Sequence, residues 1–516
     1  MRPARQDIPA IVASAVLLNL AYPPFHLILP AALCLAPVLV ALERCNEGRS
    51  PARRQMLLGF WFGALGNAVL LHWMAAALWQ YRQWAIVVFA AGILWLAALT
   101  GVAFAAVGWI RRRTGAPAWI VFPAVWTALE WLLAHQGRAA FAWLGLGTTL
   151  TGYPVLVQIA DVVGARGVGF LLAAGNAALA AAWIHRHEWR RAALRMAFVA
   201  TGWLAALLYG VFRIHHLDQR ELDRVAVVQT DIAPQDKWNR SGSAVDQVLE
   251  LSRIAAAHGP DLILWPETAL PGALLYHPEW ERSVGRLARS ASTFILAGGI
   301  HAIPRERELD QFNAAFLFGP GGERMGPPYQ RQHLVPLFEW GNGIKAGETS
   351  TILPLRHGLI GVLICGEATY ESLARAHRRK GAGALVNLSN DAWFAAGTGA
   401  HQQAAHVIMR AIETRAGVAR AANRGISEIV DPAGRVRQRV PGDGSGIAVG
   451  YLATTEAIPL YVRLGDWVGL LSVGAAGAFL ALSAAVMLRA SALCRGAKPR
   501  SSRVDGGMPH GRRIGC

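Results

Sequence analysis

The chain has 516 residues, of which 53% are hydrophobic and only 16% are charged. Together with a mean hydropathy of +0.31, this composition excludes an ordinary soluble protein and indicates an integral membrane protein. The formal net charge of +17 does not indicate nucleic-acid binding, because the arginines gather in short clusters between apolar runs and no aromatic–basic RNA-binding motif is present.

Apolar runs long enough to cross a bilayer fill the first part of the chain. A membrane helix needs about 20 mostly apolar residues, and seven such runs precede residue 214. The predicted spans are 8–24, 27–43, 55–79, 84–110, 116–134, 154–184, 192–212 and, near the C-terminus, 466–488. We therefore expect a seven-span region over residues 1–213, an eighth transmembrane helix over 466–488 and a basic cytoplasmic tail over 489–516.

The loops between these runs alternate in basic charge. Arginines cluster at the N-terminus, at 44–54, at 111–113, at 186–195 and after residue 488, whereas the intervening loops carry at most one. Because basic loops stay in the cytoplasm, this pattern predicts that both termini are cytoplasmic and that residues 214–465 lie on the outer side. The alternative is that the arginines only solubilise the loops.

Residues 214–465 have the texture of an α/β domain. Helical patterns at 243–258, 279–291, 371–380 and 401–422 alternate with strand-like apolar runs. This alternation predicts buried sheets covered by helices. The expected strands are Val225–Gln229, Leu262–Trp265, Phe294–Gly298, Ala314–Phe318, Leu359–Ile364 and Ala384–Leu388.

Two of these predicted strands end in reactive groups. Glu267 follows Leu262–Trp265, and Cys365 directly follows Leu359–Ile364. A free thiol with a pKa of ~8.5 needs a base or a positive charge to form the attacking thiolate at neutral pH. The sequence therefore predicts Cys365 as a nucleophile and Glu267 as its general base. The alternatives are a small buried cysteine and a helix-capping or structural glutamate.

The remaining cysteines indicate neither a metal site nor a disulfide framework, and we expect no metal and no cofactor. The full set is Cys34, Cys45, Cys365, Cys494 and Cys516.

Four motifs in order carry a resemblance to a known superfamily. They are Trp-Pro-Glu-Thr ending at position 268, Arg-Gln-His-Leu-Val-Pro at 331–336, Ile-Cys-Gly-Glu at 364–367 and Ser-Asn-Asp-Ala-Trp-Phe at 389–394. This series resembles the nitrilase, or carbon–nitrogen hydrolase, superfamily, which implies an αββα sandwich with a Glu-Lys-Cys triad. With the membrane region, including 141–145 and 153–167, the whole chain is similar to the apolipoprotein N-acyltransferase family.

The resemblance implies an activity and its partners. An acyl chain would pass from a phospholipid to a cysteine thioester, and then to the α-amino group of a lipoprotein's diacylglyceryl-cysteine. The enzyme would lie in the bacterial inner membrane as a monomer, with its catalytic domain on the periplasmic side.

The resemblance also assigns roles to residues of this chain. Cys365 would be the nucleophile, Glu267 the base, and Arg331 would stand at the position of the family's lysine. Glu339 and Glu367 would support the triad, with structural hydrogen bonding as the alternative. Substrate would contact the following residues: Trp238, Asn390, Asp391, Trp393 and Phe394.

Three departures from the family pattern bear on activity. Arg331 replaces the lysine that stabilises the oxyanion, Gly366 replaces an aromatic residue, and the stretch 340–347 is shorter than the family's mobile arm. An arginine keeps the charge but has a larger, planar geometry. Two alternatives therefore stay open: a divergent membrane-bound amidase or hydrolase, and a catalytically impaired paralogue serving an export or conjugation system.

Overall fold

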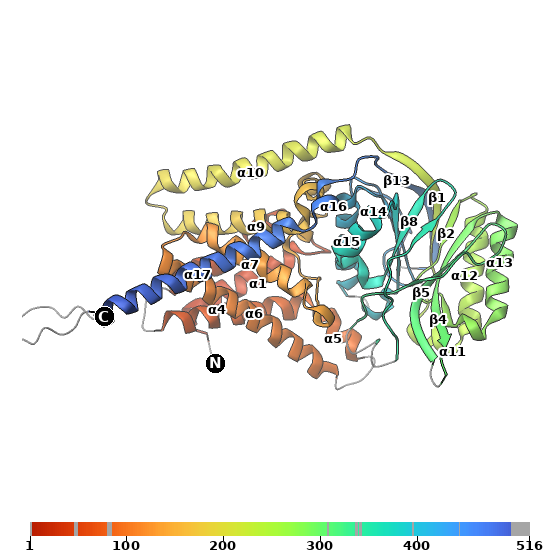
Figure 1. The fold of residues 1–516 in the computed structure, drawn as a ribbon, viewed down its shortest axis with the longest axis horizontal. Helices are drawn as coiled ribbons and strands as arrows, with labels where there is room; N and C mark the ends of the chain where they lie inside the picture. Colours follow the sequence, from red (N-terminus) through yellow and green to blue (C-terminus); the bar gives the residue numbers. More distant parts are fainter. Residues whose placement is uncertain are drawn as a thin grey trace, which may run out of the picture.

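A helical bundle and a two-sheet domain lie side by side in the computed structural model (Figure 1). The structure describes residues 3–45, 50–79, 85–306, 309–335, 339, 343–394, 397–442 and 444–496. The long helix α10 (Trp189–His216) runs along the bundle and leads into the first strand of the domain, and α17 (Trp467–Gly496) returns from the domain along the bundle.

Apolar helices of very different lengths form the bundle. Among the described residues, four helices are long and apolar enough to cross a membrane: Ile86–Thr114, Ala160–Ile184, Arg190–His216 and Trp467–Ala492. The other bundle helices are α1 (Ile8–Ala21), α2 (Ile28–Leu33), α3 (Ala36–Arg44), α4 (Pro51–Leu70), α5 (His72–Trp79), α7 (Ala118–Ala134) and α8 (Pro154–Val157).

These helices coincide with the predicted spans, but several spans are divided. The span expected at 27–43 consists of α2 and α3, and the one at 55–79 consists of α4 and α5. The one at 154–184 contains α8 and α9 (Ala160–Ile184), and α9 itself is kinked at Gly164, where φ is +70°. The eight-span organisation and its boundaries stay a prediction, and residues 497–516 of the predicted tail lie outside the described residues.

The domain contains two sheets packed face to face, which confirms the predicted α/β sandwich. In the described residues, the first sheet has the order β13-β1-β2-β4-β5-β6 with β3 beside β4, and the second has the order β12-β11-β10-β9-β8-β7. The strands are β1 (Arg220–Gln229), β2 (Leu262–Leu264), β3 (Leu270–Ala273), β4 (Phe294–Pro304), β5 (Leu309–Phe318), β6 (Tyr329–Gln330), β7 (Ile352–Pro354), β8 (Leu359–Ile364), β9 (Ala384–Ser389), β10 (Val418–Ala422), β11 (Glu428–Val430), β12 (Val436–Arg439) and β13 (Gly446–Thr454).

Helices cover the outer face of each sheet. Figure 1 shows α12 (Ser241–Ala256) and α13 (Pro278–Ala291) outside the first sheet, and α14 (Glu371–Arg379) and α15 (Gly399–Thr414) between the second sheet and the bundle. Alternate side chains of β1 serve two cores, because Val225 and Val227 pack between the sheets and Ala226 and Val228 pack under the outer helices. Shorter helices are α11 (Pro234–Asn239) and α16 (Leu460–Leu464).

One predicted helix is partly wrong. The alanine-rich stretch 401–422 was expected to be helical throughout, but α15 ends at Thr414 and residues 418–422 form β10. Arg415 adopts a left-handed conformation with φ +49°, which ends the helix. The strand then pairs with β9 and β11, so tertiary pairing outweighs the helical propensity of its alanines.

Buried polar contacts join the domain to the bundle. The side chain of Glu413 in α15 accepts a hydrogen bond from the Ala165 backbone N–H at 2.7 Å, and Arg415 donates to Asp161 at 2.7 Å. Gln402 Oε1 accepts from the indoles of Trp73 and Trp143 at 3.1 and 2.8 Å. The α15 helix is therefore fixed to the bundle along its length.

Candidate active site

The ends of parallel strands from both sheets meet at one edge of the domain. In the first sheet, the residues after β2 lead to Glu267; in the second, β8 leads to Cys365 and β9 to Asn390. The backbone N–H of Glu267 donates to the Ser389 carbonyl at 3.4 Å, which joins the two edges directly. The structure therefore brings the two predicted reactive groups to the same place.

Cys365 stands on a sharp turn that lifts it out of the strand. Its φ of +53° is unusual for a residue with a side chain and costs on the order of 1–3 kcal/mol unless the surroundings hold it. The residue is only 9% exposed and begins the short 3₁₀ helix η6 (Cys365–Thr369). Thr268, beside Glu267, has a similar φ of +48°. Both reactive segments are thus held in strained conformations, as is common at functional sites.

The Glu267 carboxylate has one satisfied oxygen and one free oxygen. Its Oε1 accepts hydrogen bonds from Asn313 Nδ2 at 2.7 Å and from Arg331 Nη1 at 3.1 Å. Its Oε2 is buried and has no hydrogen-bond partner among the residues that the structure describes. Burial raises the pKa of Glu267, while the charge of Arg331 opposes that rise. An unpaired carboxylate oxygen with a raised pKa suits a general base.

Arg331 lies at the centre of the site and not on the surface. It is 3% exposed, and its Nη1 lies 3.1 Å from both Glu267 Oε1 and Glu339 Oε1. Its Nε donates to the His333 carbonyl at 2.9 Å. Nη2 points towards the nucleophile turn, because a Cβ added to Gly366 would lie 3.7 Å from it. Burial by itself lowers the pKa of the guanidinium, but the negative charges around it, those of Glu339 and Glu267 among them, outweigh burial and raise the pKa, so Arg331 stays charged.

Lys345, the nearest lysine after Arg331 in the chain, lies outside this cluster. Lys345 is about half exposed and donates to Asp310 at 2.5 Å. Of the stretch 340–347, residues 340–342 lie outside the described residues, so the length of the expected arm is not tested.

Glu339 and Glu367 both support the cluster, but in different ways. Glu339 pairs with Arg331, and its Oε2 accepts from the Val335 backbone N–H at 2.7 Å. Glu367 is fully buried, and its two oxygens accept from the Gln332, His333 and Ile364 backbone N–H groups and from the Tyr329 hydroxyl, at 2.6–3.1 Å. Because these donors lie both directly after Arg331 and directly before Cys365, Glu367 holds the two segments together.

The segment after β9 forms one wall of the site. Asp391 is 1% exposed and pairs with Arg420 at 2.9 Å, and Asn390 accepts from Asn423 Nδ2 at 3.0 Å. Trp393 is half-buried, whereas Phe394 packs edge-on against Trp73 of the bundle with ring centroids 4.6 Å apart. Trp238 is 48% exposed on α11. The side chains of Asn390, Asp391 and Phe394 are thus held by contacts within the protein, whereas the side chain of Trp238 is accessible to solvent.

The surroundings of the thiol keep it protonated at rest. Burial and the neighbouring carboxylate of Glu267 raise the pKa of Cys365 to about 12, against the lowering effect of Arg331. Attack therefore requires transfer of the thiol proton to a base, not a standing thiolate.

The sequence reasoning missed three residues of the site. Lys237 is 2% exposed, and its Nζ donates to the Glu267 carbonyl at 2.9 Å and to Thr268 Oγ1 at 2.7 Å. Burial lowers the pKa of Lys237 to about 8. Asn313 bridges Glu267 and Glu339, and Gln403 contacts the Cys365 sulfur. Asn313 could have been noticed as the polar residue directly before the apolar run 314–318; the other two have no comparable signal.

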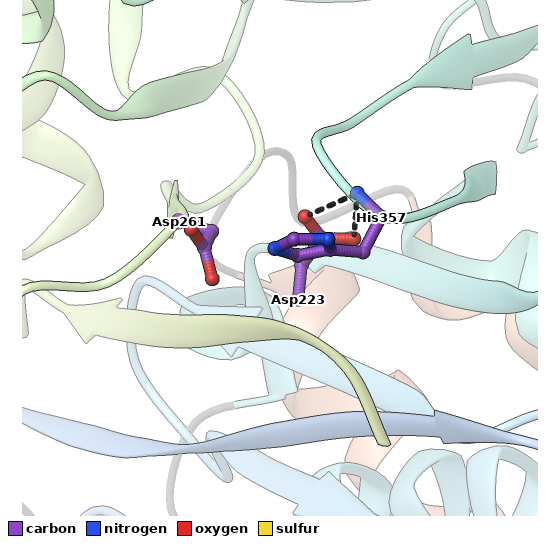
Figure 2. Close-up of side chains that lie close together, drawn as sticks. All are labelled: Asp223, Asp261 and His357. Atoms are coloured by element: carbon purple, nitrogen blue, oxygen red, sulfur yellow. Dashed lines mark hydrogen bonds between the residues drawn. The ribbon is translucent and has the colours of Figure 1, made fainter. Parts of the chain in front are cut away.

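A second group of possible ligand atoms lies far along the strands from this site. Asp223, Asp261 and His357 offer atoms within 4.8 Å of one another. Figure 2 shows the three side chains close together, and they lie near the starts of β1, β2 and β8 rather than at their ends. The His357 backbone N–H donates to Asp223, and Arg356 pairs with Asp261 at 3.3 Å. These partners account for the carboxylates without a metal ion.

The comparisons with known proteins agree with this two-part architecture. Residues 14–178 match the apolipoprotein N-acyltransferase N-terminal domain, and residues 224–457 match the carbon–nitrogen hydrolase family. Among solved structures, an amidase from Nesterenkonia sp. aligns with 48% of this chain and 95% of its own, at 18% identity and a TM-score of 0.38.

Relatives of full length are also similar. The apolipoprotein N-acyltransferase of Geobacter metallireducens is 30% identical, over 90% of this chain and 92% of its own length. That of Chlorobaculum tepidum is 28% identical, over 92% of this chain and 96% of its own. With both halves matched and the predicted cysteine and glutamate together at one edge of the domain, the chain belongs to the apolipoprotein N-acyltransferase family.

Proposed function

We propose that this protein is a membrane acyltransferase that moves a phospholipid acyl chain to the α-amino group of a lipoprotein's diacylglyceryl-cysteine, through a thioester on Cys365. The observation that carries the proposal is the unpartnered, buried Oε2 of Glu267 at the edge that also bears Cys365. The names of the full-length relatives support the substrate class.

The first half-reaction uses Glu267 and Arg331. Glu267 Oε2 takes the proton from Cys365 Sγ as the sulfur bonds to the ester carbonyl carbon of the phospholipid. Negative charge develops on the carbonyl oxygen, and Arg331 Nη2, on the side of Gly366, is the cation available to stabilise it. The C–O bond then breaks, and the departing lysophospholipid oxygen receives the proton held by Glu267.

The second half-reaction runs through the same groups in reverse order. The lipoprotein amine attacks the thioester carbonyl, Glu267 takes a proton from the amine nitrogen, and the C–S bond breaks to give a thiolate. That proton then returns to sulfur and restores the thiol. Because the two substrates react in turn with one cysteine, ping-pong kinetics are expected.

The location of the site suits lipid substrates. The domain docks on apolar helices through α15, and the basic-loop pattern supports cytoplasmic termini with the domain on the periplasmic face of the inner membrane. The catalytic unit is proposed to be a monomer, since all the groups used come from one chain.

The experiment is N-acylation of a diacylglyceryl-modified lipopeptide by membranes that contain the full chain. Cys365→Ala and Glu267→Gln are expected to lower product formation by at least about 100-fold, the range typical of a missing nucleophile or base. Cys45→Ala, another buried cysteine, and Glu281→Gln, a surface glutamate, are matched controls that keep activity.

Full activity of Cys365→Ala with intact folding would contradict the proposal. Release of free fatty acid or ammonia by the wild type, without N-acylated lipopeptide, would instead favour an amidase or hydrolase. The observation that favours this second function is that Arg331, paired with Glu267, occupies the position of the family's lysine.

A further inference from the structure

A glutamine from α15 contacts the sulfur of the nucleophile. Gln403 is fully buried, and its Nε2 donates to Cys365 Sγ at 3.7 Å, within the range of a hydrogen bond to sulfur. The catalytic scheme above uses Glu267 and Arg331 but gives no role to this contact.

The orientation of the Gln403 amide is determined by its neighbours. Its Oε1 accepts from Arg420 Nη2 at 3.1 Å and from Ser389 Oγ at 3.4 Å. A guanidinium can only donate hydrogen bonds, so the amide oxygen must face Arg420 and the amide N–H must face the sulfur. Arg420 in turn is held by Asp391 at 2.9 Å. The donor is therefore fixed before any substrate arrives.

The charged groups around the thiol act in opposite directions on its proton. The carboxylates of Glu267 and Asp391 disfavour the thiolate, and Arg331 favours it. Lys237 and the thiolate attract each other, and this attraction raises the pKa of Lys237. A neutral amide donor adds stabilisation for the thiolate without adding a charge that would also hold the leaving group or the oxyanion.

We propose that Gln403 is a further catalytic residue, whose Nε2–H donates to the Cys365 sulfur and stabilises the thiolate each time it forms. The thiolate arises twice: when Glu267 removes the thiol proton during acylation, and when the C–S bond of the thioester breaks during transfer. The same donor serves both events, because Sγ is the nucleophile in the first and the leaving group in the second.

The next residue on the helix supplies a matched control. Gln402 is also buried, but it bonds Trp73, Trp143 and the Leu70 carbonyl of the bundle. Substituting Met for Gln402 removes four side-chain hydrogen bonds, three to the bundle and one to Thr398 at the start of α15, and none to the sulfur. Substituting Met for Gln403 removes the donor to the sulfur at nearly constant volume.

The test is the rate of alkylation of Cys365 by iodoacetamide in the full-length protein in detergent, followed from pH 7 to 10 by mass spectrometry of the Cys365 peptide. Below the pKa of the thiol, the rate is proportional to the thiolate fraction. A hydrogen bond to a charged group contributes enough to shift a pKa by about one unit or more. Gln403→Met is therefore expected to slow alkylation about tenfold across this range, and Gln402→Met to leave it unchanged.

Gln403→Glu separates electrostatics from access. It keeps the shape of the side chain and the bond to Arg420, but places a carboxylate oxygen against the sulfur. Alkylation is expected to slow at least as much as in Gln403→Met. An unchanged rate in Gln403→Met, or equal slowing in Gln402→Met, would overturn the proposal, because the effect would then be absent or would come from displacement of the helix.

The catalytic part of this inference rests on the proposed acyl transfer, and the two can fail separately. Alkylation needs no lipid, so it reports on the Gln403–sulfur contact alone. If the wild type forms no acyl-enzyme while Gln403→Met still slows alkylation, the proposed function fails and the contact stands. If acyl-enzyme forms at the wild-type rate in Gln403→Met, the contact has no catalytic role.

Discussion

Replacing Arg331 with Met should disable the general base rather than only the oxyanion site. Arg331 Nη1 lies 3.1 Å from the carboxylates of both Glu267 and Glu339, and all three groups lie in one enclosed cluster. Without the guanidinium, two carboxylates face each other with little solvent, and protonation of one relieves the repulsion.

The size of the effect follows from the burial of the pair. Removing one partner of a buried ion pair typically costs about 3–5 kcal/mol. Loss of the guanidinium raises the pKa of Glu267 beyond the rise that burial already causes, so less of the carboxyl is in the deprotonated form that accepts the thiol proton. At ~1.36 kcal/mol per tenfold change in rate, a loss of this size corresponds to a fall of about 100-fold or more in the acylation of Cys365.

The assay is single-turnover acylation of Cys365 as a function of pH. Since Glu267 acts in its deprotonated form, the acid limb of the profile should move to higher pH in Arg331→Met. Arg331→Lys keeps a charge and should recover much of the loss. Arg324→Met removes a partly exposed arginine paired with Glu281 at 3.8 Å, and should change neither rate nor stability by more than ~0.5 kcal/mol.

The stability of Arg331→Met should show the matching sign. A raised carboxyl pKa means that the folded chain binds more protons than the unfolded chain above pH ~4.5. The variant should therefore lose more stability at pH 8 than at pH 5, relative to the wild type. Wild-type acylation with an unmoved acid limb in Arg331→Met would refute this reasoning.

Three further predictions concern buried charged groups of the domain. Burial lowers the pKa of Lys237 to about 8, so the acylation rate of the wild type should decline above that pH. Lys237→Met should be slower at neutral pH and should not show this decline. A decline that persists unchanged in the variant would exclude Lys237 as its source. Arg420→Met leaves Asp391 buried and unpaired, and should cost about 3–5 kcal/mol in thermal unfolding, much of which Arg420→Met with Asp391→Asn recovers; strictly additive losses would contradict the pairing. Burial raises the pKa of Glu413 to about 7, so between pH ~4.5 and 7 this group lowers the free energy of unfolding as pH rises. Glu413→Gln should reduce the slope of unfolding free energy against pH by up to ~1.4 kcal/mol per pH unit. An unaltered slope would refute this assignment.

Cys365 and Glu267 could be predicted from sequence because each follows an apolar strand-like run. The carboxyl ends of parallel strands in two packed sheets lie at the same edge of the domain, so reactive residues that follow such strands come close together. Here the hydrogen bond from Glu267 N–H to the Ser389 carbonyl joins the two sheets at that edge. Arg331 could be placed only through the motif that surrounds it, since the strand that precedes it, β6, has just two residues.

Lys237 and Gln403 could not be predicted, for a physical reason. Each lies on a helix whose local sequence is compatible with solvent, and its contacts in the site come from other segments: Glu267 is 30 residues from Lys237, and Cys365 is 38 residues from Gln403. For the stretch 418–422 the local sequence gave a wrong prediction. Its alanines favour a helix, but pairing with β9 and β11 makes it a strand. Polar residues that act through long-range contacts leave no periodic signal in the chain.

The central claim is that Cys365 carries the acyl chain. Membranes containing the wild-type protein should be given phospholipid with a labelled acyl group and no acceptor, and the labelled peptide should be identified. The account predicts a label on Cys365 that neutral hydroxylamine releases and that Cys365→Ala lacks. Absence of label from the wild type, in membranes where the protein is folded and Cys365 can be alkylated, would contradict the account.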